Sequence, residues 1–185
     1  MIAGIGHNSG RVDEPGRAFR RFAWGKARTQ LLPKLPIEVV RRRVLRAKEL
    51  GLPYKTYAGL RASSGDDLIG FLFSSNALRV LTARDQVSDA MQEKLAMLQN
   101  ARKIGLAQGR VAPRDLVPPM QSAYPAPRPL APWSDAKEKL AALLEAEKLP
   151  GSRTVLVCDT ELELEWLAAA RLAGAIPADV YFDTQ

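Results

Sequence analysis

The sequence predicts a mixed α/β protein in which a helical N-terminal region is joined to a small C-terminal β-α-β segment with a parallel sheet. Apolar residues recur at spacings of three and four after Pro36, which is the period of an amphipathic helix. Near the C-terminus, a segment with helix-capping residues lies between two short apolar runs, an order typical of two parallel strands joined by a helix. Seven prolines within residues 111–133 separate the two parts.

Composition restricts the class of protein. The chain has 185 residues, of which 46% are apolar and 25% are charged, so it can bury one ordinary core or two small ones. Its single cysteine, Cys158, allows no intramolecular disulfide, which fits a reducing compartment. No apolar run approaches the roughly 20 residues of a membrane helix, and the N-terminus lacks the basic leader of a secretory signal. We therefore expect a cytoplasmic protein.

The N-terminal part of the chain is strongly basic. Residues 11–61 contain fourteen Lys or Arg and four acids, a net charge of +10 that exceeds the +7 of the whole chain. Such one-sided charge is typical of proteins that bind a polyanion. Residues 1–35 are rich in Gly and Arg and are expected to form a basic flexible arm. The aromatic residues of this arm could stack on bases or dock on the protein's own domain; they are Phe19, Phe22 and Trp24.

Residues 36–110 are expected to form a helical region that opens with two helices around a tight turn. Pro36 suits the first turn of a helix, and Gly51 ends that helix as a C-cap would. The Leu-Pro pair that follows prevents its continuation, and a second short helix is expected from about Pro53 through Arg61. The apolar positions of the first helix are Ile37, Val40, Val44 and Ala47.

Two further elements are expected in the same region. Residues 68–73 form an apolar run that could be a buried strand or a buried helix, and its short length and flanking Gly and Ser residues favour a strand. Asn76 would cap a following helix. A longer amphipathic helix is expected from about Arg84 to Ile104, and its apolar stripe would face the core or a partner. That stripe consists of Val87, Met91, Leu95 and Leu98.

The last third of the chain begins with the prolines. Residues 111–133 are expected to form an extended strap or linker, because seven prolines forbid a regular helix or an interior strand. Residues 134–185 are expected to form the small α/β unit, and the strand at residues 68–73 could join its sheet. The expected elements of this unit are a helix from Ser134 to about Glu147, a strand from Thr154 to Cys158, a helix from Glu161 to Leu172 with a Thr160–Glu163 capping box, and a strand from Ala178 to Phe182.

Residues 43–62 resemble the helix-turn-helix of repressor-type DNA-binding proteins. That family places a small residue in the first helix, a Gly four positions later in the turn, and apolar residues around both. Ala47 and Gly51 fill the first two of these roles, whereas Arg46 lies where an apolar residue is usual and Pro53 restricts the conformations open to the turn. The apolar roles fall to Leu50, Leu52, Tyr57 and Leu60.

The resemblance implies which residues would contact DNA. The first residues of the second helix would reach base edges or phosphates, and the arginines of the first helix would face the DNA backbone. The alternative interpretation of these side chains is a solvated helix face. The predicted nucleic-acid-binding residues are Arg41, Arg42, Arg43, Arg46, Tyr54, Lys55, Thr56 and Arg61.

Two shorter strings also resemble known proteins. Residues 49–56 resemble the helix-helix turn of ribbon-helix-helix antitoxins, although no N-terminal ribbon precedes them. Residues 5–10, Ile-Gly-His-Asn-Ser-Gly, resemble a short N-terminal signature of alphaproteobacterial prophage and mobile-element proteins. The second resemblance implies a context for the protein, and it implies no chemistry.

An acid at the end of a predicted strand raises the possibility of an enzyme. Asp159 follows the apolar run that ends at Cys158 and precedes a capped helix, which is where α/β folds place ligands and nucleophiles. Ser74, Ser75 and Asn76 end the other apolar run and could converge on it. Asp159 is nevertheless explained as a turn residue, Cys158 as a small buried hydrophobe, and the sole histidine, His7, has no His or Cys cluster around it. We therefore predict no catalytic residue, no metal site and no cofactor.

We therefore expect a non-enzymatic DNA-associated regulator or accessory protein of a phage or mobile-element type. Its basic N-terminal half would bind double-stranded DNA, and its acidic C-terminal unit would mediate dimerisation or contact a protein partner. Two alternatives remain open. One is an interaction or assembly protein whose basic segment binds an acidic partner, and the other is a small α/β hydrolase or transferase that uses Asp159. No membrane partner is expected.

Overall fold

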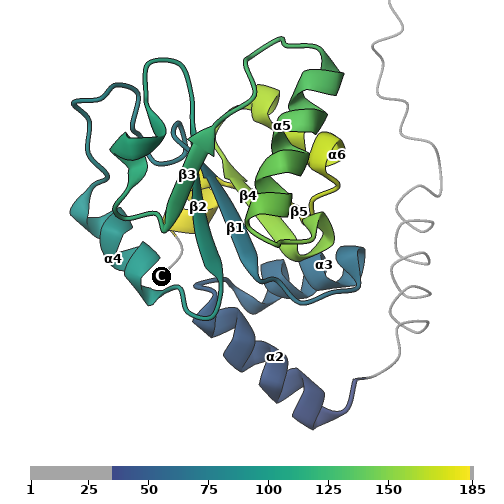
Figure 1. Ribbon diagram of the computed structural model, residues 1–185. Helices are drawn as coiled ribbons and strands as arrows, with labels where there is room; N and C mark the ends of the chain where they lie inside the picture. The colour runs from purple at the N-terminus through teal and green to yellow at the C-terminus, as the bar shows by residue number, and fades with distance from the viewer. Residues whose placement is uncertain (1–34, 184–185) are drawn as a thin grey trace, which may run out of the picture. The chain divides into compact units, whose positions relative to one another are not determined.

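The computed structural model describes residues 35–183, and Arg41–Gln185 form the second of the two units into which the chain divides (Figure 1). The second unit contains a five-stranded sheet in which every strand pair is parallel, in the order β3-β2-β1-β4-β5. The predicted mixed α/β class with a parallel sheet is therefore confirmed. The strands are β1 (Gly70–Ser74), β2 (Arg102–Ala107), β3 (Ser122–Pro125), β4 (Thr154–Cys158) and β5 (Gly174–Pro177).

Helices precede and connect the strands. Single-turn 3₁₀ segments, labelled η, lie between several of them. The predicted basic arm and the Ile-Gly-His-Asn-Ser-Gly string lie outside the described residues. The helical elements are α2 (Ile37–Glu49), α3 (Tyr54–Ser64), α4 (Asp89–Met97), η1 (Pro113–Leu116), α5 (Trp133–Ala146), η2 (Gly151–Arg153), η3 (Glu161–Leu164), α6 (Glu165–Ala170) and α7 (Ala178–Phe182).

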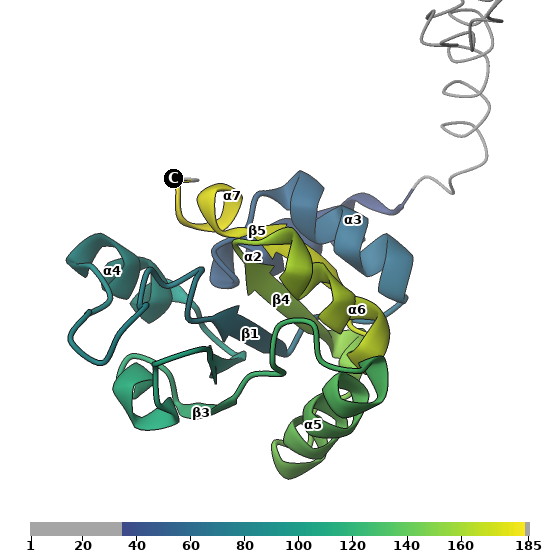
Figure 2. The same cartoon turned by 90° about the horizontal axis from the view of Figure 1, so that it is seen from above.

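The sheet is buried on both faces. Successive side chains of β1 point to opposite faces, so Phe71 and Phe73 pack with residues of α3, α4 and α7, whereas Leu72 packs with residues of α5 and α6. Figure 2 shows α5 and α6 together on one side of the sheet. All five residues of β1 and of β4 are buried, which explains why both strands appear in the sequence as continuous apolar runs instead of alternating ones.

The predicted pair of helices around a tight turn is confirmed. The turn contains Gly51, whose φ of +64° favours a glycine. Ala47 is 1% exposed and Leu50 is fully buried, so this corner of the two helices contributes to the core. Tyr57 of α3 is also buried there.

The expected helix from Arg84 to Ile104 is wrong at both ends, because α4 begins only at Asp89. The helix ends at Met97, and residues 102–107 form β2, paired in parallel with β1. The apolar stripe does belong to the core, because Val87, Leu95 and Leu98 are buried. Sheet pairing overrides the helical pattern here, and Gly105 permits η1 to pack on β2, since a Cβ at this position would lie 2.8 Å from Cδ1 of Leu116.

The expected strand from Ala178 to Phe182 is also wrong, because these residues form α7 and the strand β5 lies just before them. Pro177 ends β5, since a proline has no N–H for the ladder. The helix then places Tyr181 beside Phe71 and Phe73, with ring centroids 5.9 Å and 5.5 Å apart. Tyr181 and Phe182, whose aromatic side chains favoured a strand, instead pack against a face of the sheet.

The predicted division at residues 111–133 does not separate two sheets. β1 pairs with β4, so the segments 36–110 and 134–185 share one sheet, and the region expected to be helical supplies two of its strands. The proline-rich segment also contributes β3 at the edge of the sheet. Pro125 is tolerated because edge strands have few ladder bonds, and the N–H of Ala126 donates to the carbonyl of Ala107 at this end of the strand.

One buried hydroxyl should be dispensable. The hydroxyl of Tyr181 is the buried side-chain polar atom within residues 35–183 that has no hydrogen-bond partner there, whereas the hydroxyl of Tyr57 donates to Oδ1 of Asp67 at 2.8 Å. Tyr181→Phe should therefore leave the free energy of unfolding unchanged or raise it by up to about 1 kcal/mol, and Tyr57→Phe should lower it by about 1–2 kcal/mol. Urea denaturation measures both free energies of unfolding. Equal losses of stability in the two variants would contradict the conclusion that the hydroxyl of Tyr181 has no hydrogen-bond partner.

Candidate functional site

The carboxylate of Asp67 connects the two N-terminal helices to the start of β1. Its Oδ2 accepts a hydrogen bond from Nε of Arg46 at 3.0 Å, and its Oδ1 accepts from the hydroxyl of Tyr57 at 2.8 Å and from the backbone N–H of Leu68 at 2.9 Å. Arg61 of α3 lies 3.6 Å from the same carboxylate. One carboxylate therefore accepts hydrogen bonds from α2, from α3 and from the residue Leu68 that precedes β1.

Arg46 makes the largest number of these contacts. Besides Asp67, its guanidinium donates to Oε2 of Glu49 at 2.7 Å and to the backbone carbonyls of Leu68 at 2.8 Å and Asn100 at 3.0 Å. Only 15% of its side chain is exposed. A helix-turn-helix usually has an apolar residue at this position. Here the position is occupied by Arg46, which is held in place by charge-assisted hydrogen bonds.

The protonation of Asp67 follows from this environment. Burial by itself raises the pKa of the carboxyl, but the hydrogen bond from Tyr57 and the guanidinium of Arg46 outweigh it, so the pKa is lowered from its ordinary value of 3.8. Burial and the hydrogen bond to Asp67 raise the pKa of Tyr57. The ionised carboxylate is the form that the fold stabilises.

The remaining predicted nucleic-acid-binding residues differ in exposure. Arg41 and Arg42 of α2 and Lys55 of α3 are exposed, whereas Arg43, Tyr54 and Thr56 are half-buried. Tyr54 packs against the core cluster that contains Tyr57. The eight predicted residues therefore lie on two adjoining helices. Of these residues, Arg46 and Arg61 form ion pairs with Asp67, and Tyr54 packs against the core.

The second helix has few long side chains on its surface. Its exposed residues are Lys55, Gly59, Ala62 and Ser63. Base edges are read mainly by Arg, Lys, Asn and Gln side chains, and Lys55 is the only one of these types in that set. This helix is therefore poorly equipped for sequence-specific readout in the described structure.

Within residues 41–64, four cations form no ion pair with any described residue. They are Arg42, Arg43, Lys48 and Lys55. Lys48, which is not among the residues predicted from the sequence, is exposed near the end of α2. Its place one helical turn after Val44 on the exposed face could have identified it from the sequence alone.

A second polar cluster lies at the carboxyl edge of the sheet. The strand order reverses between β1 and β4, and ligands of open α/β sheets bind at such a switch point. Here Nδ2 of Asn76 donates to Oε1 of Glu163 at 3.0 Å and to Oε1 of Gln108 at 3.2 Å, and Nε2 of Gln108 also donates to Glu163. The loops after β1, β2 and β4 meet in this cluster.

Glu163 is the centre of this cluster. It is 1% exposed, and its Oε2 accepts the backbone N–H groups of Asp159 at 2.7 Å and Thr160 at 3.1 Å. The capping interaction predicted from Thr160 and Glu163 is thus present at the start of η3. The sequence did not show that the same carboxylate also receives Asn76 and Gln108, because those residues are distant in the chain.

Asp159 and the polar residues around it take part in hydrogen bonds within the described structure. Oδ2 of Asp159 accepts a hydrogen bond from Arg79 at 2.7 Å. The neighbouring Cys158 is 4% exposed, and burial raises the pKa of its thiol to about 11. Ser74 and Ser75, expected to converge here, are buried and accept the backbone N–H groups of Ala77 and Gln108. These polar groups hold the loops together.

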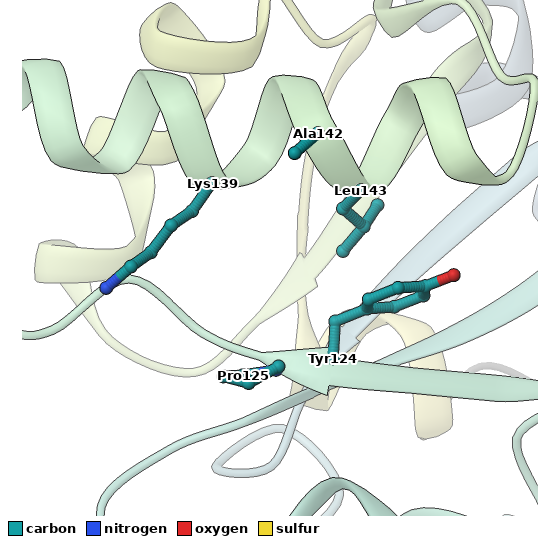
Figure 3. Close-up of a pocket in the computed structure, with 5 residues that line it drawn as sticks. All are labelled: Tyr124, Pro125, Lys139, Ala142 and Leu143. Atoms are coloured by element: carbon teal, nitrogen blue, oxygen red, sulfur yellow. The ribbon is translucent and has the colours of Figure 1, made fainter.

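An apolar groove lies between the edge strand β3 and α5 (Figure 3). Its volume is about 250 Å³, below the range of typical small-molecule sites. Its polar groups are already engaged, because the hydroxyl of Tyr124 donates to Oε1 of Glu147 at 2.9 Å and Nζ of Lys139 lies 3.1 Å from Oδ2 of Asp135. The lining residues are Tyr124, Pro125, Lys139, Ala142 and Leu143.

No protein-family model matches the chain, and neither a curated protein nor a solved structure matches it. Among residues 35–183, no group of three or more His, Cys, Asp or Glu is arranged to hold a metal ion. None of the helices described is both long and apolar enough to cross a membrane.

Asp67→Asn should destabilise the protein in a pH-dependent way. Loss of the ionised acceptor should lower the free energy of unfolding by about 2 kcal/mol at neutral pH. Because the folded pKa of Asp67 is lowered, its contribution is complete above its ordinary value of 3.8 and is lost as the pH falls through the folded value. The difference between variant and wild type should therefore vanish at low pH.

Denaturant titrations at several pH values measure this difference. Asp66→Asn is the matched control, because the exposed Asp66 accepts one side-chain bond, from Ser152 at 3.0 Å; its effect should stay below about 0.5 kcal/mol. A loss in Asp67→Asn that is constant with pH would show that the ionisation of Asp67 is not what stabilises the corner.

Proposed function

We propose that this protein is a non-enzymatic, DNA-associated accessory protein that contacts phosphates through α2 and the start of α3. The observation that carries the proposal is the set of four cations in residues 41–64 that pair with no described acid. Cations of this kind exchange water and counterions for phosphates without breaking an internal ion pair. The contacting residues would be Arg42, Arg43, Lys48 and Lys55.

The same helices favour contact with the DNA backbone over reading of the sequence. Arg46 and Arg61 hold the two helices on Asp67, so their guanidinium groups position the cations instead of supplying base contacts. α3 exposes Gly59, Ala62 and Ser63, which are too short to make bidentate contacts in a groove. An accessory role therefore fits better than the role of a sequence-specific regulator.

The proposal is tested by the salt dependence of binding. Arg42→Ala combined with Arg43→Ala should weaken binding to a labelled duplex and flatten the slope of log K against log salt by about two units, because two phosphate contacts are lost. Fluorescence anisotropy across a salt series measures the slope. Arg110→Ala combined with Arg128→Ala is the control, since it removes the same charge from exposed positions elsewhere. Equal slopes for the two double variants would remove α2 from the interface.

Binding should also depend little on base sequence. Duplexes of equal length and different sequence should differ by less than about 1 kcal/mol in binding free energy, whereas each wrong base pair costs a sequence-specific reader about 1–3 kcal/mol. Competition with unlabelled duplexes measures these differences. A strong preference for one sequence would contradict backbone recognition and would require base-reading groups beyond those that α3 exposes.

A further inference from the structure

The exposed side of α2 carries large aliphatic side chains between cations. Leu45 is 63% exposed and Val44 is 44% exposed. Lys48 follows Val44 by four residues and Leu45 by three, so these three side chains share one side of the helix, and Arg42, three residues before Leu45, lies at the margin of that side. We call these residues, Arg42, Val44, Leu45 and Lys48, the α2 patch. A phosphate backbone would pair with the cations and leave the aliphatic groups uncovered.

A patch of the opposite charge lies on η3. Leu162 is 52% exposed and Leu164 is 42% exposed, and both lie between the exposed acids Glu161 and Glu165. The hydrogen bonds of Glu163 explain this exposure. They hold its side chain inward at the sheet edge, so its two leucine neighbours are directed away from it. We call Glu161, Leu162, Leu164 and Glu165 the η3 patch.

The two patches lie at opposite edges of the sheet. Arg46 of α2 binds Asp67 and the carbonyl of Leu68, just before β1 begins, whereas η3 follows the end of β4, which pairs in parallel with β1. Parallel strands start at one edge and end at the other, and five residues span roughly 16 Å. The patches therefore cannot cover each other within one chain. Figure 1 shows α2 beyond the edge at which the strands begin.

We propose that the protein self-associates head to tail, with the α2 patch of one copy packed on the η3 patch of a second copy. Each patch consists of two aliphatic side chains flanked by two charges, and the charges are basic on α2 and acidic on η3. The exposed acids of the η3 patch, Glu161 and Glu165, complement the cations of α2. The pairing would remove Leu45, Val44, Leu162 and Leu164 from water and match every flanking charge with its opposite.

The geometry determines the type of assembly. The contact is heterologous, because the two patches differ, so each bound copy still presents one unused patch of each kind. Association should therefore continue beyond a dimer unless the rotation between copies closes a ring. The four aliphatic side chains make a small interface, which predicts a weak and concentration-dependent association. This inference goes beyond nucleic-acid binding and does not rest on it.

Charge reversal tests the proposal with the full chain in the absence of nucleic acid. Arg42→Glu combined with Lys48→Glu makes the α2 patch acidic, and Glu161→Lys combined with Glu165→Lys makes the η3 patch basic. Each double variant then juxtaposes like charges and should self-associate about tenfold more weakly or worse than wild type. An equimolar mixture should associate again, because each variant meets an oppositely charged patch on the other. Sedimentation velocity over a concentration series measures all four samples.

Two further variants test the aliphatic contact without changing charge. Leu45→Ser and Leu162→Ser replace exposed side chains, so both should fold as wild type does and both should lower the average mass in solution. The proposal is overturned if wild type remains monomeric, if either charge reversal or either serine variant leaves association unchanged, or if the mixture fails to restore it. A monomeric wild type that still binds duplex would leave the proposed function intact and assign the α2 patch to another partner.

Discussion

The hydrogen-bonded carboxylate of Asp67 is the constraint on which the N-terminal half of the described structure depends. It lies where the chain leaves α3 and enters β1, and it holds Arg46 from one helix and Tyr57 from the next. Because these groups are part-buried and charge-assisted, losing one partner leaves the others poorly paired. Together with the buried side chains of Ala47 and Leu50, this acid holds α2 near the start of β1 and thereby determines how the cations of the helix are displayed.

Glu163 has the corresponding role at the opposite edge of the sheet. It closes the turn after β4 through two backbone N–H groups and joins that turn to the loops after β1 and β2 through Asn76 and Gln108. The cluster occupies the place where many parallel sheets bind a ligand. Here its hydrogen-bonding capacity is used to fix the loops, and the outward direction of the neighbouring leucines is a consequence.

The sequence predicted those elements whose signals are local. β4 was identified from its apolar run, and the capping carboxylate of Glu163 from its distance to Thr160. The strand at residues 102–107 was missed, because its pairing with β1 is non-local and the preceding helical stripe continued into it. The nucleic-acid interface was predicted from charge and spacing alone, which cannot show that Arg46 meets Asp67, a residue 21 positions later.

The two proposals use the same surface of α2 in different ways. Phosphates would engage Arg42 and Lys48 as cations, whereas a second copy would also cover Val44 and Leu45. Because the shared cations cannot pair with a phosphate and with Glu161 or Glu165 at once, binding of one partner must weaken the other by mass action. The coupling between the two binding free energies is reciprocal. Adding nucleic acid would therefore dissociate an assembly into single copies. The exposed leucines explain why such an assembly could form at all, since cations and acids alone at a solvated surface contribute little.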